Sequence, residues 1–152
     1  MKKFAFALFA CCTVLANSGC SSQSQNFYAK AVAPLPSTQT VTQLSRHGHV
    51  VIIDVPAATN SSRNLLDASR LRTGIATKAS TAIARDISAS EKHVTLVTGE
   101  NGAIVAETIA KALKDSTPNS ASTLAFFGDS DYAKSIGDAV RLAGMNFEYV
   151  QP

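Results

Sequence analysis

Four acidic side chains lie at or just after the ends of runs that are typical of buried strands: Asp54, Glu100, Asp129 and Asp131. Parallel strands end at one edge of their sheet, and ligands of open α/β sheets bind at that edge. Carboxylates grouped there could hold Mg²⁺, Ca²⁺ or a polar ligand. Each of these acids also lies just before or at the start of a predicted helix, where it would cap free amides and offset the helix dipole. We expect capping to be their main role, with a ligand or metal site as the alternative.

Three histidines, His47, His49 and His93, precede two of the same strand-like runs. Imidazole nitrogens are common Zn²⁺ ligands, and three of them at the amino edge of a sheet could form a zinc site. No acidic residue that would orient these rings stands out in the sequence. Strand entrances are often polar by default, so we expect ordinary polar roles here, with zinc binding as the alternative.

Recognised catalytic signatures are missing or misplaced in this sequence. Arg46-His47-Gly48 resembles the RHG signature of the histidine phosphatase family, in which the histidine accepts a phosphoryl group. In that family the triplet follows the first strand, whereas here it precedes the strand-like run VVIID. The patterns GxGxxG, GxxxxGK[ST] and GxSxG are absent from the sequence. We therefore assign no catalytic residue and no cofactor.

An alternation of strand and helix patterns must position these side chains. Short runs rich in apolar and β-branched residues predict strands at 49–55, 93–99, 122–129 and 146–150. Apolar residues at three- and four-residue steps predict helices at 61–87, 101–115 and 130–144, and Gly74 is expected to weaken or kink the first. Strands separated by helices of this length pair in parallel through right-handed crossovers. We predict an α/β fold, a small three-layer sandwich with a parallel four-stranded sheet (βαβαβαβ) and three helices.

The chain begins with a segment of the kind that directs export. Lys2 and Lys3 precede a run from Phe4 to Ala16 that carries no charge. A run of this length is typical of a signal peptide and is shorter than the roughly 20 residues that span a bilayer. We expect three parts along the chain: a signal peptide at 1–19, a tether rich in Ser, Gln, Thr and Pro at 20–45, and a single α/β domain at 46–152.

The residues Ser18-Gly19-Cys20 resemble the lipobox of bacterial lipoproteins. That resemblance implies a diacylglycerol on the Cys20 thiol and cleavage just before this residue. In the same family, Ser21 in the next position implies sorting to the outer membrane, and we expect the domain to face the periplasm.

The other cysteines are consistent with that interpretation. Cys11 and Cys12 would leave with the signal peptide, so the mature protein would carry no free thiol. An unpaired thiol is a hazard in an oxidising compartment, and a lipid on Cys20 removes it. Ala16-x-Ser18 also fits an ordinary signal peptidase site, which would leave Cys20 without lipid.

Charge and organisation together favour one class of function. The 14 Lys and Arg residues and the 11 Asp and Glu residues are spread along the sequence. Nucleic-acid binding needs a concentrated basic face, so we expect no nucleic-acid partner. We predict a non-enzymatic envelope lipoprotein, an accessory or scaffold component of an outer-membrane assembly of secretion, pilus or conjugation type, with an envelope protein as partner. The alternatives are a periplasmic ligand- or metal-binding α/β module and a small hydrolase.

Overall fold

The structure, a computed structural model, describes residues 36–152, and the predicted signal peptide and Cys20 lie outside this range. Four parallel strands form one sheet in the order β1-β2-β3-β4. They are β1 (His49–Asp54), β2 (His93–Thr98), β3 (Thr123–Phe127) and β4 (Asn146–Val150). The predicted α/β class and the parallel four-stranded sheet are confirmed.

The two central strands are the most apolar parts of the fold. Every residue of β2 and β3 is buried, whereas β1 and β4 at the sheet edges are partly exposed. When a parallel strand is covered on both faces, its sequence is a continuous apolar run and does not alternate between apolar and polar residues. This explains why the strands could be located from their composition.

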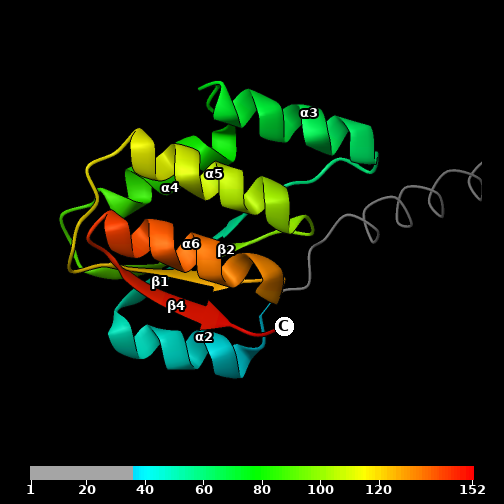
Figure 1. The fold of residues 1–152 in the computed structure, drawn as a ribbon. Helices are drawn as coiled ribbons and strands as arrows, with labels where there is room; N and C mark the ends of the chain where they lie inside the picture. Colours follow the sequence, from blue (N-terminus) through cyan, green and yellow to red (C-terminus); the bar gives the residue numbers. More distant parts are fainter. Residues whose placement is uncertain (1–35) are drawn as a thin grey trace, which may run out of the picture. The chain divides into compact units, whose positions relative to one another are not determined.

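Helices that cross over between the strands all cover one face of the sheet (Figure 1). They are α3 (Ser61–Arg72), α4 (Lys78–Ile87), α5 (Gly102–Lys114) and α6 (Ser130–Leu142). Each crossover moves one place in the same direction, and right-handed crossovers in one direction place their helices on one side. The main core lies between these helices and the sheet, with Ile83, Ile109 and Val140 packed near Leu124 and Phe126.

The helix predicted over residues 61–87 is two helices, which corrects the predicted count of three helices. Helix α3 ends at Arg72, and Gly74 follows with a φ of 99° in the left-handed region that favours glycine. The amide of Ile75 bonds the carbonyl of Arg70 at 3.0 Å, as in a helix that stops at a glycine. Three- and four-residue steps along a continuous helix would place Ile75 on the buried face with Ala68 and Leu71, whereas after the break at Gly74 it is 56% exposed.

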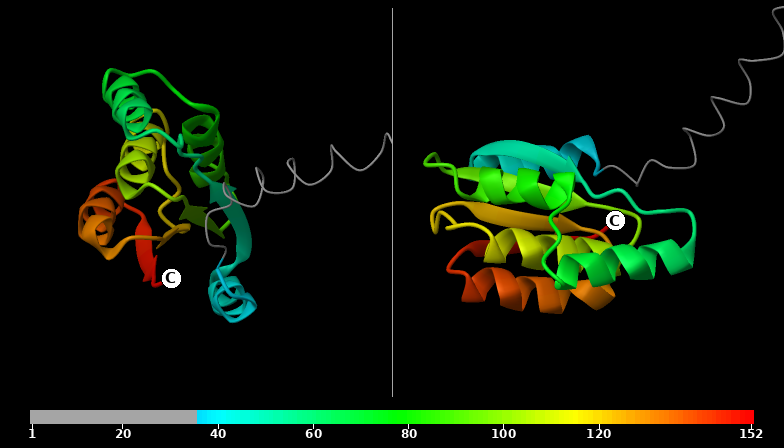
Figure 2. Two further views of the ribbon diagram at one scale, coloured as in Figure 1. Left: turned by 90° about the vertical axis from the view of Figure 1, so that its right-hand side faces the viewer. Right: turned by 90° about the horizontal axis from the view of Figure 1, so that it is seen from above.

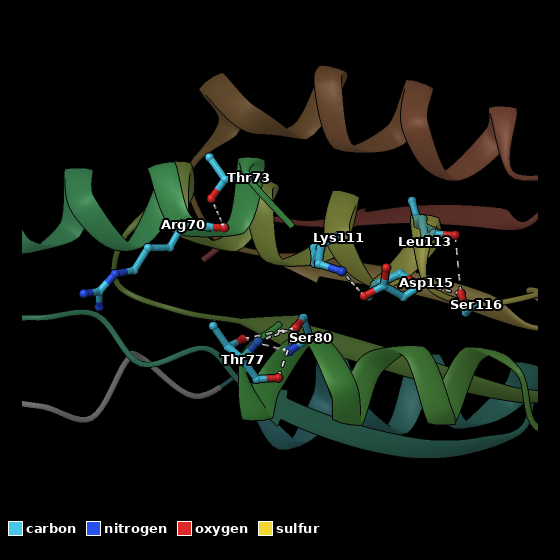
Figure 3. A network of polar contacts seen from close by, with 9 residues as sticks. Arg70, Thr73, Thr77, Ser80, Lys111, Leu113, Asp115 and Ser116 are labelled. Atoms are coloured by element: carbon cyan, nitrogen blue, oxygen red, sulfur yellow. Dashed lines mark hydrogen bonds and ion pairs between the residues drawn. The ribbon is translucent and has the colours of Figure 1, made fainter. Parts of the chain in front are cut away.

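A reciprocal cap starts the second of these helices. The Thr77 hydroxyl accepts from the amide of Ser80 at 3.1 Å, and the Ser80 hydroxyl accepts from the amide of Thr77 at 2.8 Å (Figure 3). Such a capping box satisfies two amides that a helix start would otherwise leave without partners. Residues 73–77 are therefore a defined break between α3 and α4.

The other face of the sheet is covered by a helix that lies within the predicted tether. Helix α2 (Thr38–Leu44) continues through a 3₁₀ turn at Ser45–His47 into β1. Leu44 is 1% exposed and packs with Val94, Leu96 and Phe127. Figure 2 shows α2 on the side of the sheet opposite α3–α6. The third layer thus comes from residues before 46, and the folded unit begins earlier than the predicted boundary.

Within residues 36–152, no helix has the length and apolar character needed to span a membrane.

We expect Leu44→Ala to lower the free energy of unfolding by about 2–5 kcal/mol, because it leaves a cavity between α2 and the two central strands. Urea unfolding followed by circular dichroism measures this change. Gln43→Ala, at an exposed position of the same helix, is the matched control and should stay within about 0.5 kcal/mol of the parent protein. Equal small losses for both variants would mean that α2 is not part of the fold.

Candidate functional site

A groove of about 610 Å³ lies beside the carboxyl end of β1. Its walls come from the end of β1, from α3, from the start of α4 and from α5. The lining residues are Ile53, Asp54, Val55, Pro56, Asp67, Leu71, Thr77, Lys78, Ala79, Ala82, Ile104 and Thr108. This is the edge of the sheet at which open α/β folds bind ligands. We refer to this set of residues as the β1 groove.

The break between α3 and α4 accounts for the position of the groove. Both helices pack against α5, so residues of α5 lie between them. A continuous helix would have kept the two segments on one axis, whereas the turn at Gly74 separates them. Ile104 and Thr108, one turn apart on α5, line the groove as a result.

Most of the groove is apolar, and its polar groups are few. Thr108 is 1% exposed, and its hydroxyl has no hydrogen-bond partner among the described residues. Asp67 forms an ion pair with Arg70 at 3.5 Å. Asp54 and Lys78 take part in none of the ion pairs found within residues 36–152. The groove therefore combines an apolar lining with one orphaned hydroxyl and two opposite charges that lack partners in the described part of the chain.

The carboxyl group of Asp54 is in an unfavourable position for a negative charge. Partial burial raises its pKa above the ordinary 3.8, and repulsion from the nearby Glu100 carboxylate raises the pKa further. Two of the four predicted acids, Asp54 and Glu100, are thus close enough to interact across the ends of β1 and β2. Because like charges repel, this pair is suited to a positively charged group placed between or beside them.

The other two acids sit at the start of α6. The side chain of Asp129 accepts a hydrogen bond from the amide of Asp131 at 3.0 Å, which is the expected capping role. At α5 the cap is Asn101 rather than Glu100. No three His, Cys, Asp or Glu side chains within residues 36–152 lie together in a way that could hold a metal ion.

The three histidines do not share one environment. His49 lies beside His93 in the parallel register, and both His47 and His49 are exposed. His93 is buried, with Nδ1 at 2.8 Å from the carbonyl oxygen of Glu91 and Nε2 at 3.2 Å from a carboxylate oxygen of Asp86. The three histidines therefore do not gather into a metal-binding group in the described region.

Asp86 is a polar partner that the sequence analysis missed. It lies in the last turn of α4, and its carboxylate also accepts from the Thr95 hydroxyl at 2.6 Å. Asp86 thus connects α4 to β2 through two buried side chains of that strand, Thr95 and His93. The sequence shows only that Asp86 lies near the end of a predicted helix. This position does not indicate which strand residue Asp86 contacts.

Comparisons of the chain with protein-family models, with curated proteins and with solved structures find no match. The functional assignment therefore rests on the residues of this chain and on their geometry.

We expect Asp54→Asn to stabilise the protein at neutral pH, because it removes a charge that the fold disfavours. A carboxyl whose pKa is raised by folding favours the folded state below its ordinary pKa of 3.8 and opposes it at higher pH. The gain in the free energy of unfolding should therefore shrink as the pH falls towards 3.8. Denaturant unfolding at a series of pH values measures it.

Asp138→Asn is the control of opposite sign. Hydrogen bonding to Lys134, at 2.7 Å, lowers the pKa of Asp138, so its charge favours folding at neutral pH. Asp138→Asn should lower stability at neutral pH, and the loss should disappear once the pH is below the lowered pKa. A destabilising Asp54→Asn at neutral pH would contradict the proposed environment of Asp54.

Proposed function

We propose that the protein is a lipid-anchored lipoprotein of the bacterial outer membrane whose domain faces the periplasm and serves as an accessory or scaffold part of an envelope assembly. The observation that carries this proposal is the position of Cys20. It follows small residues at the border between an uncharged run and a polar tether, as in a lipobox.

The physical chemistry of the anchor supports this function. Each acyl methylene buried in a membrane contributes about 0.8 kcal/mol, so one chain binds only marginally, and two or more hold firmly. A diacylglycerol on Cys20 supplies two chains. Removal of Cys11 and Cys12 with the signal peptide would also leave no thiol exposed to oxidation.

Exposed apolar side chains on α3 support a protein partner for the domain. Leu65 is 74% exposed and Leu66 is 51% exposed, although the same helix buries Ala68 and Leu71 against the core. Adjacent exposed leucines leave apolar surface in water, and burying that surface in a partner is favourable. We place the contact with an envelope protein of a secretion, pilus or conjugation type of assembly on this side of α3.

We expect Cys20→Ser to abolish labelling with palmitate and to move the protein from the membrane fraction to the soluble fraction. The matched control is the double variant Cys11→Ser with Cys12→Ser, which should keep both labelling and membrane association because these residues leave with the signal peptide. Labelling that survives Cys20→Ser, or that depends on Cys11 or Cys12, would refute lipidation at Cys20.

A photo-crosslinking residue placed at Leu65 should capture one dominant envelope protein in living cells. Leu142 on α6 is 91% exposed and serves as the control position, from which that product should be absent or weak. Changing Leu66 to Lys should reduce the product at position 65, because a charge there opposes burial of the surface. Equal capture from positions 65 and 142, or none from either, would argue against a scaffold that uses α3.

A further inference from the structure

The β1 groove has the chemistry of a binding site for a small molecule that carries both charges. We propose that it binds a short peptide with free termini and apolar side chains, with the peptide ammonium held at Asp54 and the peptide carboxylate held at the start of α4 beside Lys78. This inference concerns a site in the domain and does not depend on the lipid anchor.

The size and lining of the groove set the size of the ligand. Its volume of about 610 Å³ lies within the range of roughly 300–1,000 Å³ that is usual for small-molecule sites. Ile53, Leu71 and Ile104 supply apolar surface from three different elements. Aliphatic side chains of a peptide of two or three residues would lose water-exposed surface there, which favours binding.

The charged residues of the groove favour a ligand whose two ends carry opposite charges. Asp54 and Lys78 line the same groove, yet no ion pair joins them or engages either one within the described residues. A ligand ammonium beside Asp54 would relieve the repulsion between Asp54 and Glu100. A ligand carboxylate near Lys78 would supply the opposite charge that this side chain lacks. A purely cationic or purely anionic ligand would satisfy only one of the two.

The start of α4 adds a second reason to place the carboxylate there. Helix α4 has 10 residues, and its capping box uses the amides of Thr77 and Ser80. The amides of Lys78 and Ala79 donate to no acceptor in the described part of the chain. Free amides and the positive end of a helix dipole both stabilise an anion at this position. Acidic residues are also absent from the first turn of α4.

Within the described part of the chain, Thr108 adds an unpartnered polar group to the wall of the groove. Thr108 lines the groove and is 1% exposed, and its hydroxyl oxygen, which is itself buried, has no partner among residues 36–152. Buried hydroxyls normally have hydrogen-bond partners, and one without a partner costs stability. A peptide has an amide between its charged ends, which offers a donor and an acceptor to this hydroxyl once the Thr108 side chain turns toward the ligand.

The first experiment uses isothermal titration calorimetry on the full-length protein with dileucine as the probe. Three analogues serve as matched controls: N-acetyl-dileucine lacks the ammonium, dileucine amide lacks the carboxylate, and diglycine lacks the apolar side chains. We expect dileucine to bind and each analogue to bind at least about tenfold more weakly. Equal binding of dileucine and diglycine would refute the role of the apolar lining, and failure of dileucine to bind at millimolar concentration would refute the proposal.

The second experiment assigns each end of the ligand to its residue. Asp54→Asn should weaken dileucine binding by roughly tenfold or more and should change N-acetyl-dileucine binding little, because the lost interaction is with the ammonium. Lys78→Gln should also weaken dileucine binding, but it should change dileucine amide binding little, because the lost interaction is with the carboxylate. Asp138→Asn lies on α6 outside the groove and should leave all affinities unchanged. Loss of binding that does not follow this pairing of variant and analogue would refute the proposed orientation.

The third experiment separates binding from stability at Thr108. Thr108→Val keeps the shape of the side chain and removes the hydroxyl, so the free protein should melt at the same or a higher temperature while dileucine binding weakens. A lower melting temperature would show that the hydroxyl has a partner in the free protein and would remove this support for the site. Asp54→Asn changes a side chain that is only partly buried, so it tests the site independently of Thr108.

Discussion

A constant direction of chain crossover determines the architecture of this domain. The strands lie in chain order, β1-β2-β3-β4, so every connection steps the same way across the sheet. Right-handed connections of this kind place all of their helices on one face. The opposite face of β2 and β3 is just as apolar, and it would be exposed without another element. Helix α2 meets that need with Leu44, which is why a segment with the composition of a tether folds against the sheet.

The β1 groove results from the way in which the first crossover covers this face of the sheet. Three helices side by side would cover this sheet face, but the first crossover is divided at Gly74 into α3 and α4. Both halves rest on α5, and the β1 groove lies where they separate. The groove therefore results from a break in one helix at the strand edge where parallel sheets usually bind ligands. Its charged residues come from three elements: Asp54 from the end of β1, Asp67 from α3 and Lys78 from the start of α4.

The unfavourable environment of Asp54 is consistent with a functional role. Burial and the Glu100 charge both raise the pKa of Asp54, so this residue opposes folding at neutral pH. Thr108 adds a buried hydroxyl without a partner in the described residues. Binding sites often retain groups that lower stability, because those groups are satisfied by the ligand rather than by the protein. The proposed anchor and the proposed peptide site are compatible, since a tethered domain can bind a small ligand and contact a larger partner through α3.

The sequence by itself determined the local elements. Apolar β-branched runs located all four strands within one or two residues, and periodic apolar positions located α5 and α6, because these patterns depend on residues close together in the chain. The predicted acids at one sheet edge were partly informative: Asp54 and Glu100 interact there, and Asp129 caps α6. Only the tertiary structure decided the order of the strands, the packing of α2, the Asp86–His93 contact and the residues of the β1 groove. Each of these depends on which distant segments meet, and that choice is made by the burial of the whole chain rather than by any local run of residues.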